Sequence, residues 1–392
     1  MDAEARRAAE HAARHSYGRL LAYLAARTHD VAAAEDALAD ALHAALRTWP
    51  DRGVPDNPDA WLLTAARRVL VSGHRRQRVR DDAAPTVAWL QQATAHAPEA
   101  SPLPDERLEL LFICAHPAID RAVRAPLMLQ VVLGLDAARL ASAFLVAPAT
   151  MSQRLVRAKA RIARAGIPFA VPEGEALTER LTDVLDAIYA AFGVAWHEVV
   201  QGSDRMGDLV EEALWLARVL VERLPEAPEA RGLLALMLHS DARRAARRDA
   251  SGRFVPLGDQ DVTRWDGNRM DEADRLLHEA SRRGRPGPFQ LEAAIQAAHA
   301  SRRHTGRTPW EGIAQLYAAL VALAPSLGAR VGHAAALAEA VGPGEALRLL
   351  DTLPAAQVQA YQPYWALRAH VLARRGDHDA ARDAYARASG LT

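Results

Sequence analysis

The stretch DAARLASAFLVAPATMSQRLVRAKARIARAG, residues 136–166, predicts two helices joined by a tight turn. Asp136 is a favourable N-cap for the first helix, because its carboxylate can accept hydrogen bonds from free backbone N–H groups. Pro148 suits the first turn of the second helix, where its missing N–H costs nothing. The apolar residues at helical spacing on the second helix, which should face inward, are Met151, Leu155 and Ala158. The stretch therefore predicts a helix-turn-helix.

The outward face of that second helix carries side chains typical of DNA recognition. Gln and Arg can each form two hydrogen bonds with a base edge, and Arg and Lys bind phosphates. No Asp or Glu occurs between residues 137 and 172, so this segment would not repel DNA phosphates. The candidate DNA-binding residues here are Thr150, Gln153, Arg154, Arg157, Lys159 and Arg161. The alternative interpretation is an ordinary helix hairpin on the protein surface.

A second segment without acidic residues spans residues 60–80 and also has helical apolar spacing. Two separate cationic helices indicate two contacts with a polyanion, which favours DNA. Asn57, just before the segment, could hydrogen-bond an unstacked base, and Trp61 could stack on one. Their alternative roles are a helix cap and a place in the core of the bundle. The candidate DNA-binding residues here are Asn57, Trp61, Arg67, Arg68, Arg75, Arg76 and Arg78.

Charge is distributed unevenly along the chain, although 48 basic residues balance 48 acidic residues over its 392 residues. Residues 1–172 contain 22 basic and 18 acidic residues, whereas residues 173–392 contain 26 basic and 30 acidic residues. The N-terminal part is therefore the candidate for nucleic-acid binding. The acidic C-terminal part could dock against it or contact another protein.

Several functional classes are disfavoured by what the sequence lacks. Cys114 is the only cysteine, which excludes an intrachain disulfide and a cysteine-based metal cluster; it follows the apolar run LLFI and should be buried. Without a Gly-rich phosphate loop, a nucleophile elbow or a Ser/His/Asp arrangement, we expect neither an enzyme nor a bound cofactor or metal. Neither a signal peptide nor an apolar run of about 18 residues is recognisable, so we expect a cytoplasmic protein without a membrane span.

The chain is predicted to be all-α, because its Ala, Leu, Arg and Glu residues favour helices and no period-two strand pattern is convincing. Loops rich in Pro and Gly divide it. We expect a helical bundle at residues 1–82, a linker at 83–103, a helix-turn-helix domain at 104–167 and a helical extension at 168–392.

The extension shows degenerate helical-hairpin repeats, and its last hairpin is the clearest. Large and small residues there stand at tetratricopeptide spacings, at Trp365, Ala369, Leu372, Ala381, Tyr385 and Ala388. We expect Trp365 and Tyr385 to fill the contact with the preceding hairpin. An irregular helical array without true repeats is the alternative.

Short segments along nearly the whole chain match motifs of one known family. In the N-terminal part they are DVAAAEDA (30–37), VPDNPDAWL (54–62), LFICAHP (111–117), FLV (144–146) and TMSQRLVRAK (150–159); in the extension they are GLLALML (232–238), GDQD (258–261) and RWD (264–266). With these motifs the chain resembles bacterial RNA polymerase sigma factors of the extracytoplasmic-function (ECF) class. More narrowly, it resembles the group with a tetratricopeptide-like C-terminal extension.

The resemblance implies a sigma region 2 bundle, a region 4 helix-turn-helix domain and a helical-repeat extension. It implies binding to the β and β′ subunits of core RNA polymerase, recognition of the −35 promoter element by region 4, and capture and melting of the −10 element by region 2. A regulatory protein on the extension is a further expected partner. The polymerase-binding residues that the resemblance implies are Asp30, Glu35, Asp36 and Asp40.

Two positions depart from the family pattern in the melting helix, where Arg68 and Ser72 replace the usual Asn and Asp. Gly73 follows and should loosen this helix. These departures support an alternative function, a helical-repeat interaction scaffold whose sigma-derived domains do not bind DNA productively. An independent helix-turn-helix repressor is a third interpretation.

Overall fold

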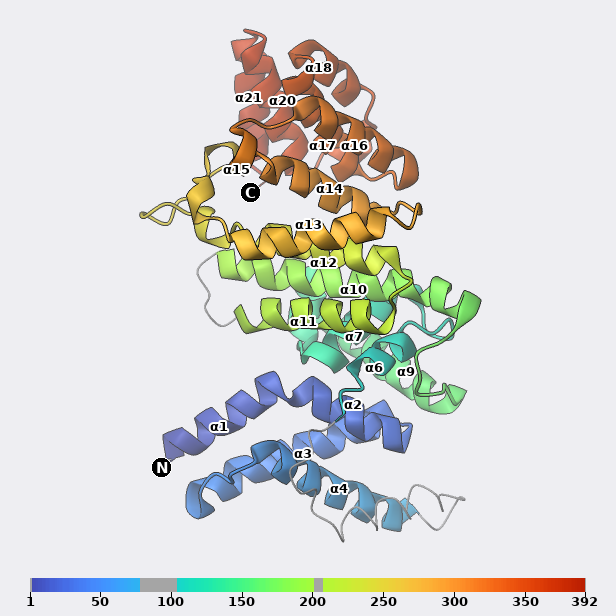
Figure 1. Cartoon of the computed structure of the whole chain (residues 1–392). Coiled ribbons are helices and arrows are strands. Elements are labelled where there is room, and N and C mark those ends of the chain that lie inside the picture. Colours follow the sequence, from blue (N-terminus) through green and yellow to red (C-terminus); the bar gives the residue numbers. More distant parts are fainter. Residues whose placement is uncertain (1, 78–103, 201–206, 392) are drawn as a thin grey trace. The chain divides into compact units, whose positions relative to one another are not determined.

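The computed structural model describes residues 2–77, 104–200 and 207–391, and all regular secondary structure within these residues is helical (Figure 1). The predicted all-α fold is confirmed. The chain divides into two compact units, Met1–Leu216 and Ala217–Thr392. Most of the predicted linker at 83–103, and Arg78 among the predicted site residues, lie outside the described residues. None of the described helices is both long and apolar enough to cross a bilayer.

Four helices form the N-terminal bundle: α1 (Asp2–His15), α2 (Tyr17–Thr28), α3 (Val31–Arg52) and α4 (Pro58–Gln77). Asp30 caps α3 as predicted, because its carboxylate accepts a hydrogen bond from the Ala33 N–H at 3.0 Å. The helix α4 continues through Gly73 to Gln77, and the loosening expected at this glycine stays a prediction. The core of the bundle contains fully buried leucines, among them Leu20, Leu21, Leu24, Leu38, Leu62 and Leu63.

The segment predicted to be a helix-turn-helix domain contains α6 (Arg107–Cys114), α7 (Arg121–Leu133), α8 (Ala137–Ala143) and α9 (Pro148–Ala165). Asp136 caps α8, accepting hydrogen bonds from the N–H groups of Ala138 at 3.0 Å and Arg139 at 2.9 Å. Pro148 occupies the first turn of α9. Cys114 is buried, and burial raises the pKa of its thiol far above the usual value. The predictions for Asp136, Pro148 and Cys114 are confirmed.

The first helix of the extension, α10 (Gly174–Val200), packs against α7 within the first unit. Arg124 of α7 pairs with Asp183 of α10 at 2.5 Å, and both side chains are only 12% exposed. The division between the two units falls inside the next helix, α11 (Gly207–Arg223). The predicted extension therefore does not begin a separate compact unit at residue 168. Its first helix, α10, packs within the first unit.

The second unit is a succession of helices from α12 to α21 (Figure 1). Neighbouring helices pack as α12 with α13, α16 with α17, and α20 with α21. Three 3-10 helices lie between α12 and α13, at Arg244–Ala246, Leu257–Asp259 and Val262–Arg264. The helices are α12 (Pro228–Asp241), α13 (Gly267–Ser281), α14 (Pro288–Ala300), α15 (Arg302–Thr305), α16 (Trp310–Leu323), α17 (Leu327–Ala340), α18 (Pro343–Asp351), α19 (Ala355–Val358), α20 (Gln362–Arg374) and α21 (His378–Ser389).

The last hairpin, α20 with α21, forms where the sequence predicted it, and its small residues Ala369, Ala381 and Ala388 are buried. Tyr385 is 47% exposed, whereas Tyr364 is 6% exposed and lies in the core shared with α17 and α18. The expectation that Tyr385 fills this contact is therefore wrong. Trp365 packs at the edge of that core.

Candidate nucleic-acid interface

Helix α9 separates its apolar and polar residues as the sequence predicted. Met151 and Leu155 are 1% exposed and Ala158 is 7% exposed, so they anchor the helix to its own domain. Gln153, Arg157 and Arg161 are exposed, and Thr150 and Arg154 are half-buried. The polar face can therefore present Gln and Arg to base edges and phosphates.

Two exposed apolar side chains on this surface were not predicted from the sequence. Leu145 is 94% exposed in the turn before α9, and Val156 is 63% exposed on the helix itself. Leu145 has a positive φ of 52°, which is unusual for a residue with a side chain. Apolar groups beside Gln and Arg can contact thymine methyl groups in the major groove. The sequence could have indicated the exposure of Leu145 and Val156, because both fall outside the stripe of apolar residues at helical spacing.

Asn57 and Trp61 take the alternative roles given for them from the sequence, a helix cap and a packing residue of the bundle. The Asn57 side chain is exposed and caps α4, accepting a hydrogen bond from the Ala60 N–H at 3.0 Å. Trp61 is half-buried and meets Trp49 edge to face, with 5.5 Å between the ring centroids. Arg68 is exposed on α4. Arg75 and Arg76 belong to α4, but their side chains are outside the described residues.

Arg67 does not lie on the surface of the bundle. It is 4% exposed, and its guanidinium donates a hydrogen bond to the Tyr23 hydroxyl at 2.8 Å. The same guanidinium lies 5.4 Å from the centroid of the Tyr23 ring. A buried, paired guanidinium cannot also reach a phosphate, so the assignment of Arg67 to DNA is corrected to a packing role between α2 and α4.

Lys159 is also buried, at 7% exposure. It pairs with Glu35 of α3, which in turn accepts a hydrogen bond from the Tyr17 hydroxyl at 3.3 Å. Burial, and then the negative charge of Glu35, raise the pKa of Tyr17 above its usual value. Lys159, predicted to bind a DNA phosphate, thus pairs with Glu35, predicted to bind polymerase. The assignment of Lys159 to DNA is therefore corrected, because in this conformation its ammonium group is not available to a phosphate.

The remaining residues of the predicted polymerase-binding set differ in availability. Asp36 and Asp40 are exposed on α3. Asp30 is half-buried, and its carboxylate caps the helix. The free acidic groups of this set are therefore on the exposed side of α3.

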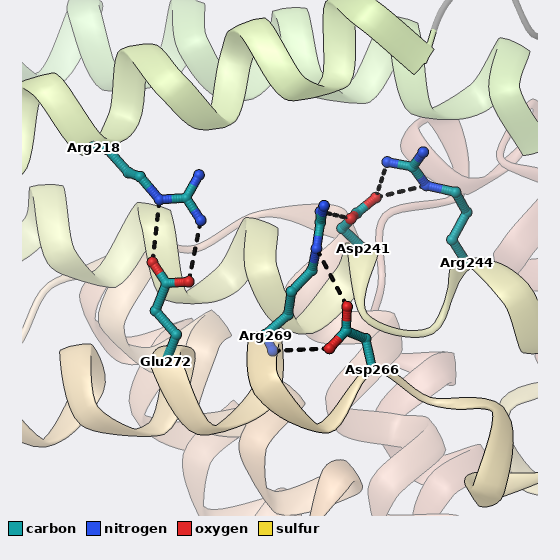
Figure 2. Close-up of polar contacts among 6 residues, drawn as sticks. All are labelled: Arg218, Asp241, Arg244, Asp266, Arg269 and Glu272. Atoms are coloured by element: carbon teal, nitrogen blue, oxygen red, sulfur yellow. Dashed lines mark hydrogen bonds and ion pairs between the residues drawn. The ribbon is translucent and has the colours of Figure 1, made fainter.

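A second polar cluster, in the extension, consists of ion pairs around Asp241 (Figure 2). The Asp241 side chain is 3% exposed and pairs with Arg244 and Arg269. Asp266 caps α13 through the Arg269 N–H at 3.1 Å, and Glu272 accepts two hydrogen bonds from Arg218, both at 3.1 Å. Each carboxylate in Figure 2 faces a guanidinium, so the cluster fixes the joint of α11, α12 and α13 instead of presenting a reactive group.

His299, on α14, lies in a cationic part of the same unit. Burial first, and then the charges of Arg243 and Arg302, lower the pKa of His299 from 6.5 to about 4. Its ring meets Trp310 edge to face, with 5.3 Å between centroids. The folded chain therefore keeps this imidazole neutral at a pH where an unfolded chain would protonate it.

We expect the extension to lose stability as the pH falls from about 6.5 to about 4, because only the unfolded state binds the His299 proton in that interval. His299→Gln should weaken this dependence of the melting temperature on pH. His378→Gln, at an exposed position at the start of α21, is the matched control and should preserve it. Identical pH profiles for the His299 variant and the unsubstituted protein would contradict the assignment.

Comparison with known proteins adds family evidence to this geometry. Residues 13–80 match the sigma-70 region 2 family, and residues 180–281 match a family of unknown function, DUF6596. An uncharacterised protein of Rhizobium meliloti (strain 1021) is 37% identical over 380 residues, which cover 95% of this chain and 88% of the relative. No solved structure matches the chain. The first match contains α2 to α4, and the second contains the ion pairs of Figure 2.

Proposed function

The chain belongs to the same family as that Rhizobium meliloti protein and carries a sigma-70 region 2 domain, and from this premise we propose that it is an ECF-class sigma factor with a regulatory helical extension. The region 2 domain supports a sigma-factor-like role in transcription initiation, with core RNA polymerase and promoter DNA as partners.

The observation that carries the proposal is the exposed polar face of α9 on the same chain as a region 2 domain. Gln153 and Arg157 are exposed on that face, Arg154 is half-buried on it, and no acidic residue lies on α9. An acid-free face of this kind can follow the major groove and read base edges. We assign it to the −35 promoter element, as region 4 of a sigma factor.

The N-terminal bundle is assigned to the −10 element. Opening a duplex requires cationic groups along the displaced strand and a site for an unstacked base. Arg68, Arg75 and Arg76 on α4 supply charge, and the exposed Asn57 precedes the first turn of α4, which carries Trp61. In this assignment Asn57 exchanges its capping bond for a base edge when the promoter opens.

The polymerase-binding surface is assigned to α3. Asp36 and Asp40 are exposed on it and can attract basic groups of the β and β′ subunits. The second unit contains apolar cores shared between successive helices, as expected for a repeat-like array that binds a protein. We therefore assign regulation, by contact with a protein, to the extension.

Run-off transcription with purified core polymerase tests the proposal. A sigma factor directs a specific transcript from a promoter mapped by transcript start sites after overexpression of the chain. The scaffold alternative, which the departures at Arg68 and Ser72 keep open, predicts that no specific transcript forms. A repressor would bind duplex DNA without polymerase.

Arg154→Ala should relax promoter discrimination at one base position by about 1–3 kcal/mol, because it removes a side chain that can hydrogen-bond a base edge. Arg161→Ala, further along the same helix and exposed, is the matched control. It should weaken binding equally for all sequences and reduce the salt dependence. Binding to promoters with single-base changes measures both. Unchanged base preference in the Arg154 variant would mean that another face or helix reads the DNA.

A further inference from the structure

The sigma region 2 bundle and the helix-turn-helix domain are packed against each other within the first unit. Helix α2 contacts α6 and α7, and α3 contacts α9. Two ion pairs cross this contact, Lys159 with Glu35 and Arg27 with Glu106, and all four side chains are less than one quarter exposed. In the proposed function these two domains must separate to reach two promoter elements, yet here partly buried ion pairs join them.

A glycine permits the closest approach in this contact. A Cβ atom added at Gly18 of α2 would lie 1.9 Å from the carbonyl oxygen of Val132 on α7. Heavy atoms cannot approach to that distance, so only glycine allows the two helix backbones to meet. Tyr17, its neighbour, lies against Gly134, where an added Cβ would be 3.3 Å from the Tyr17 ring. The sequence thus contains small residues on facing sides of the contact.

The contact also occupies groups that the proposed function requires elsewhere. Glu35 belongs to the helix assigned to core polymerase, and in this conformation its charge is neutralised by Lys159. Lys159 belongs to the helix assigned to the −35 element. Neither group can serve its external partner while the pair is intact.

We infer that this contact is an autoinhibitory latch, which holds the free protein closed and must open before core polymerase binds. The inference rests on the proposed function. If only the open state binds polymerase, the apparent dissociation constant is the intrinsic one divided by the fraction of protein that is open. Loosening the latch should therefore tighten polymerase binding without any new contact to polymerase.

Gly18→Ala in the full-length chain is the direct test, because alanine favours helix formation in α2 while its Cβ opposes the contact with α7. Gly312→Ala is the matched control, since an added Cβ there, in the first turn of α16, meets nothing within 4 Å. Lys159→Gln is a second variant, which removes the ion pair with Glu35 without adding volume at Gly18.

Two measurements separate the latch from the proposed function. The radius of gyration of the free protein, from small-angle scattering, should increase in the Gly18 and Lys159 variants and stay constant in the Gly312 control. The dissociation constant for purified core polymerase should fall by at least about five-fold in both latch variants, the lower end of a typical coupling between states.

Each other outcome overturns a defined claim. Expansion with unchanged polymerase affinity would remove the inhibitory role. The absence of expansion in both variants, with native helical content, would remove the latch itself. Expansion without polymerase binding by any variant, the unsubstituted chain included, would instead overturn the proposed function, and regulation of polymerase binding with it.

Discussion

Asp241→Asn is expected to destabilise the joint of α12 and α13 by about 3 kcal/mol, a typical cost of removing one partner of a buried ion pair. The Asp241 carboxylate is 3% exposed and pairs with Arg244 and Arg269 (Figure 2). Asparagine has nearly the same shape as aspartate, so the substitution removes the negative charge and keeps the volume of the side chain. The side chains of Arg244 and Arg269 are 32% and 28% exposed. Water can therefore solvate them in part, which places the cost at the low end of the usual range.

Hydrogen exchange of peptides from α12 and α13 measures this effect locally, which is necessary because a chain with two units need not unfold in one step. Exchange in α7, within the other unit, provides an internal reference. Asp379→Asn is the matched control: its pair with Arg382 is 92% and 76% exposed, and such pairs contribute little to stability. Equal protection of α12 in both variants would show that Asp241 is not needed to hold the joint.

The local features of the fold could be predicted because neighbouring residues determine them. Asp30 and Asp136 cap helices through N–H groups two or three residues away, and the buried face of α9 follows from helical periodicity alone. The all-α class and the positions of α8 and α9 follow from the same local preferences.

Two of the basic site residues were misassigned because their partners are distant in the sequence. Arg67 binds Tyr23, 44 residues earlier, and Lys159 binds Glu35, 124 residues earlier. A basic residue on a cationic helix looks alike in sequence whether it faces DNA or a carboxylate of another domain. Only the packing of α2 and α3 against α4 and α9 distinguishes the two cases, and that packing has no local signal.

The lack of a local signal for packing also explains why Tyr364, and not the predicted Tyr385, is buried in the last hairpin. Tetratricopeptide spacing selects Tyr385 of α21 as a large residue in the contact, yet it is 47% exposed and Tyr364 of α20 is 6% exposed. Spacing identifies a helix hairpin, whereas the rotation of that hairpin against α17 and α18 decides which large residue is covered. The two residues therefore provide a direct comparison of spacing with packing.

Tyr364→Ala should destabilise the C-terminal hairpin by about 3–5 kcal/mol, the usual cost of truncating a buried aromatic side chain, because a cavity forms among side chains that cannot fully collapse. Tyr364 shares its core with Leu347 and Leu350, and its ring meets Trp365 edge to face with 5.1 Å between centroids. Its hydroxyl also accepts a hydrogen bond from Arg368 at 3.4 Å, which the substitution removes.

Tyr385→Ala is the control for this prediction, because it makes the same chemical change on the partner helix of the same hairpin. A large part of this side chain is in water, so we expect a loss of less than about 1 kcal/mol. Urea unfolding of the full-length chain, followed through hydrogen exchange of α18 and α20, compares the two variants. A larger loss for Tyr385 than for Tyr364 would mean that the hairpin packs in the orientation that the repeat spacing predicts. The expected order, with Tyr364 dominant, follows if α20 forms the contact with α17 and α18 and leaves Tyr385 of α21 in solvent.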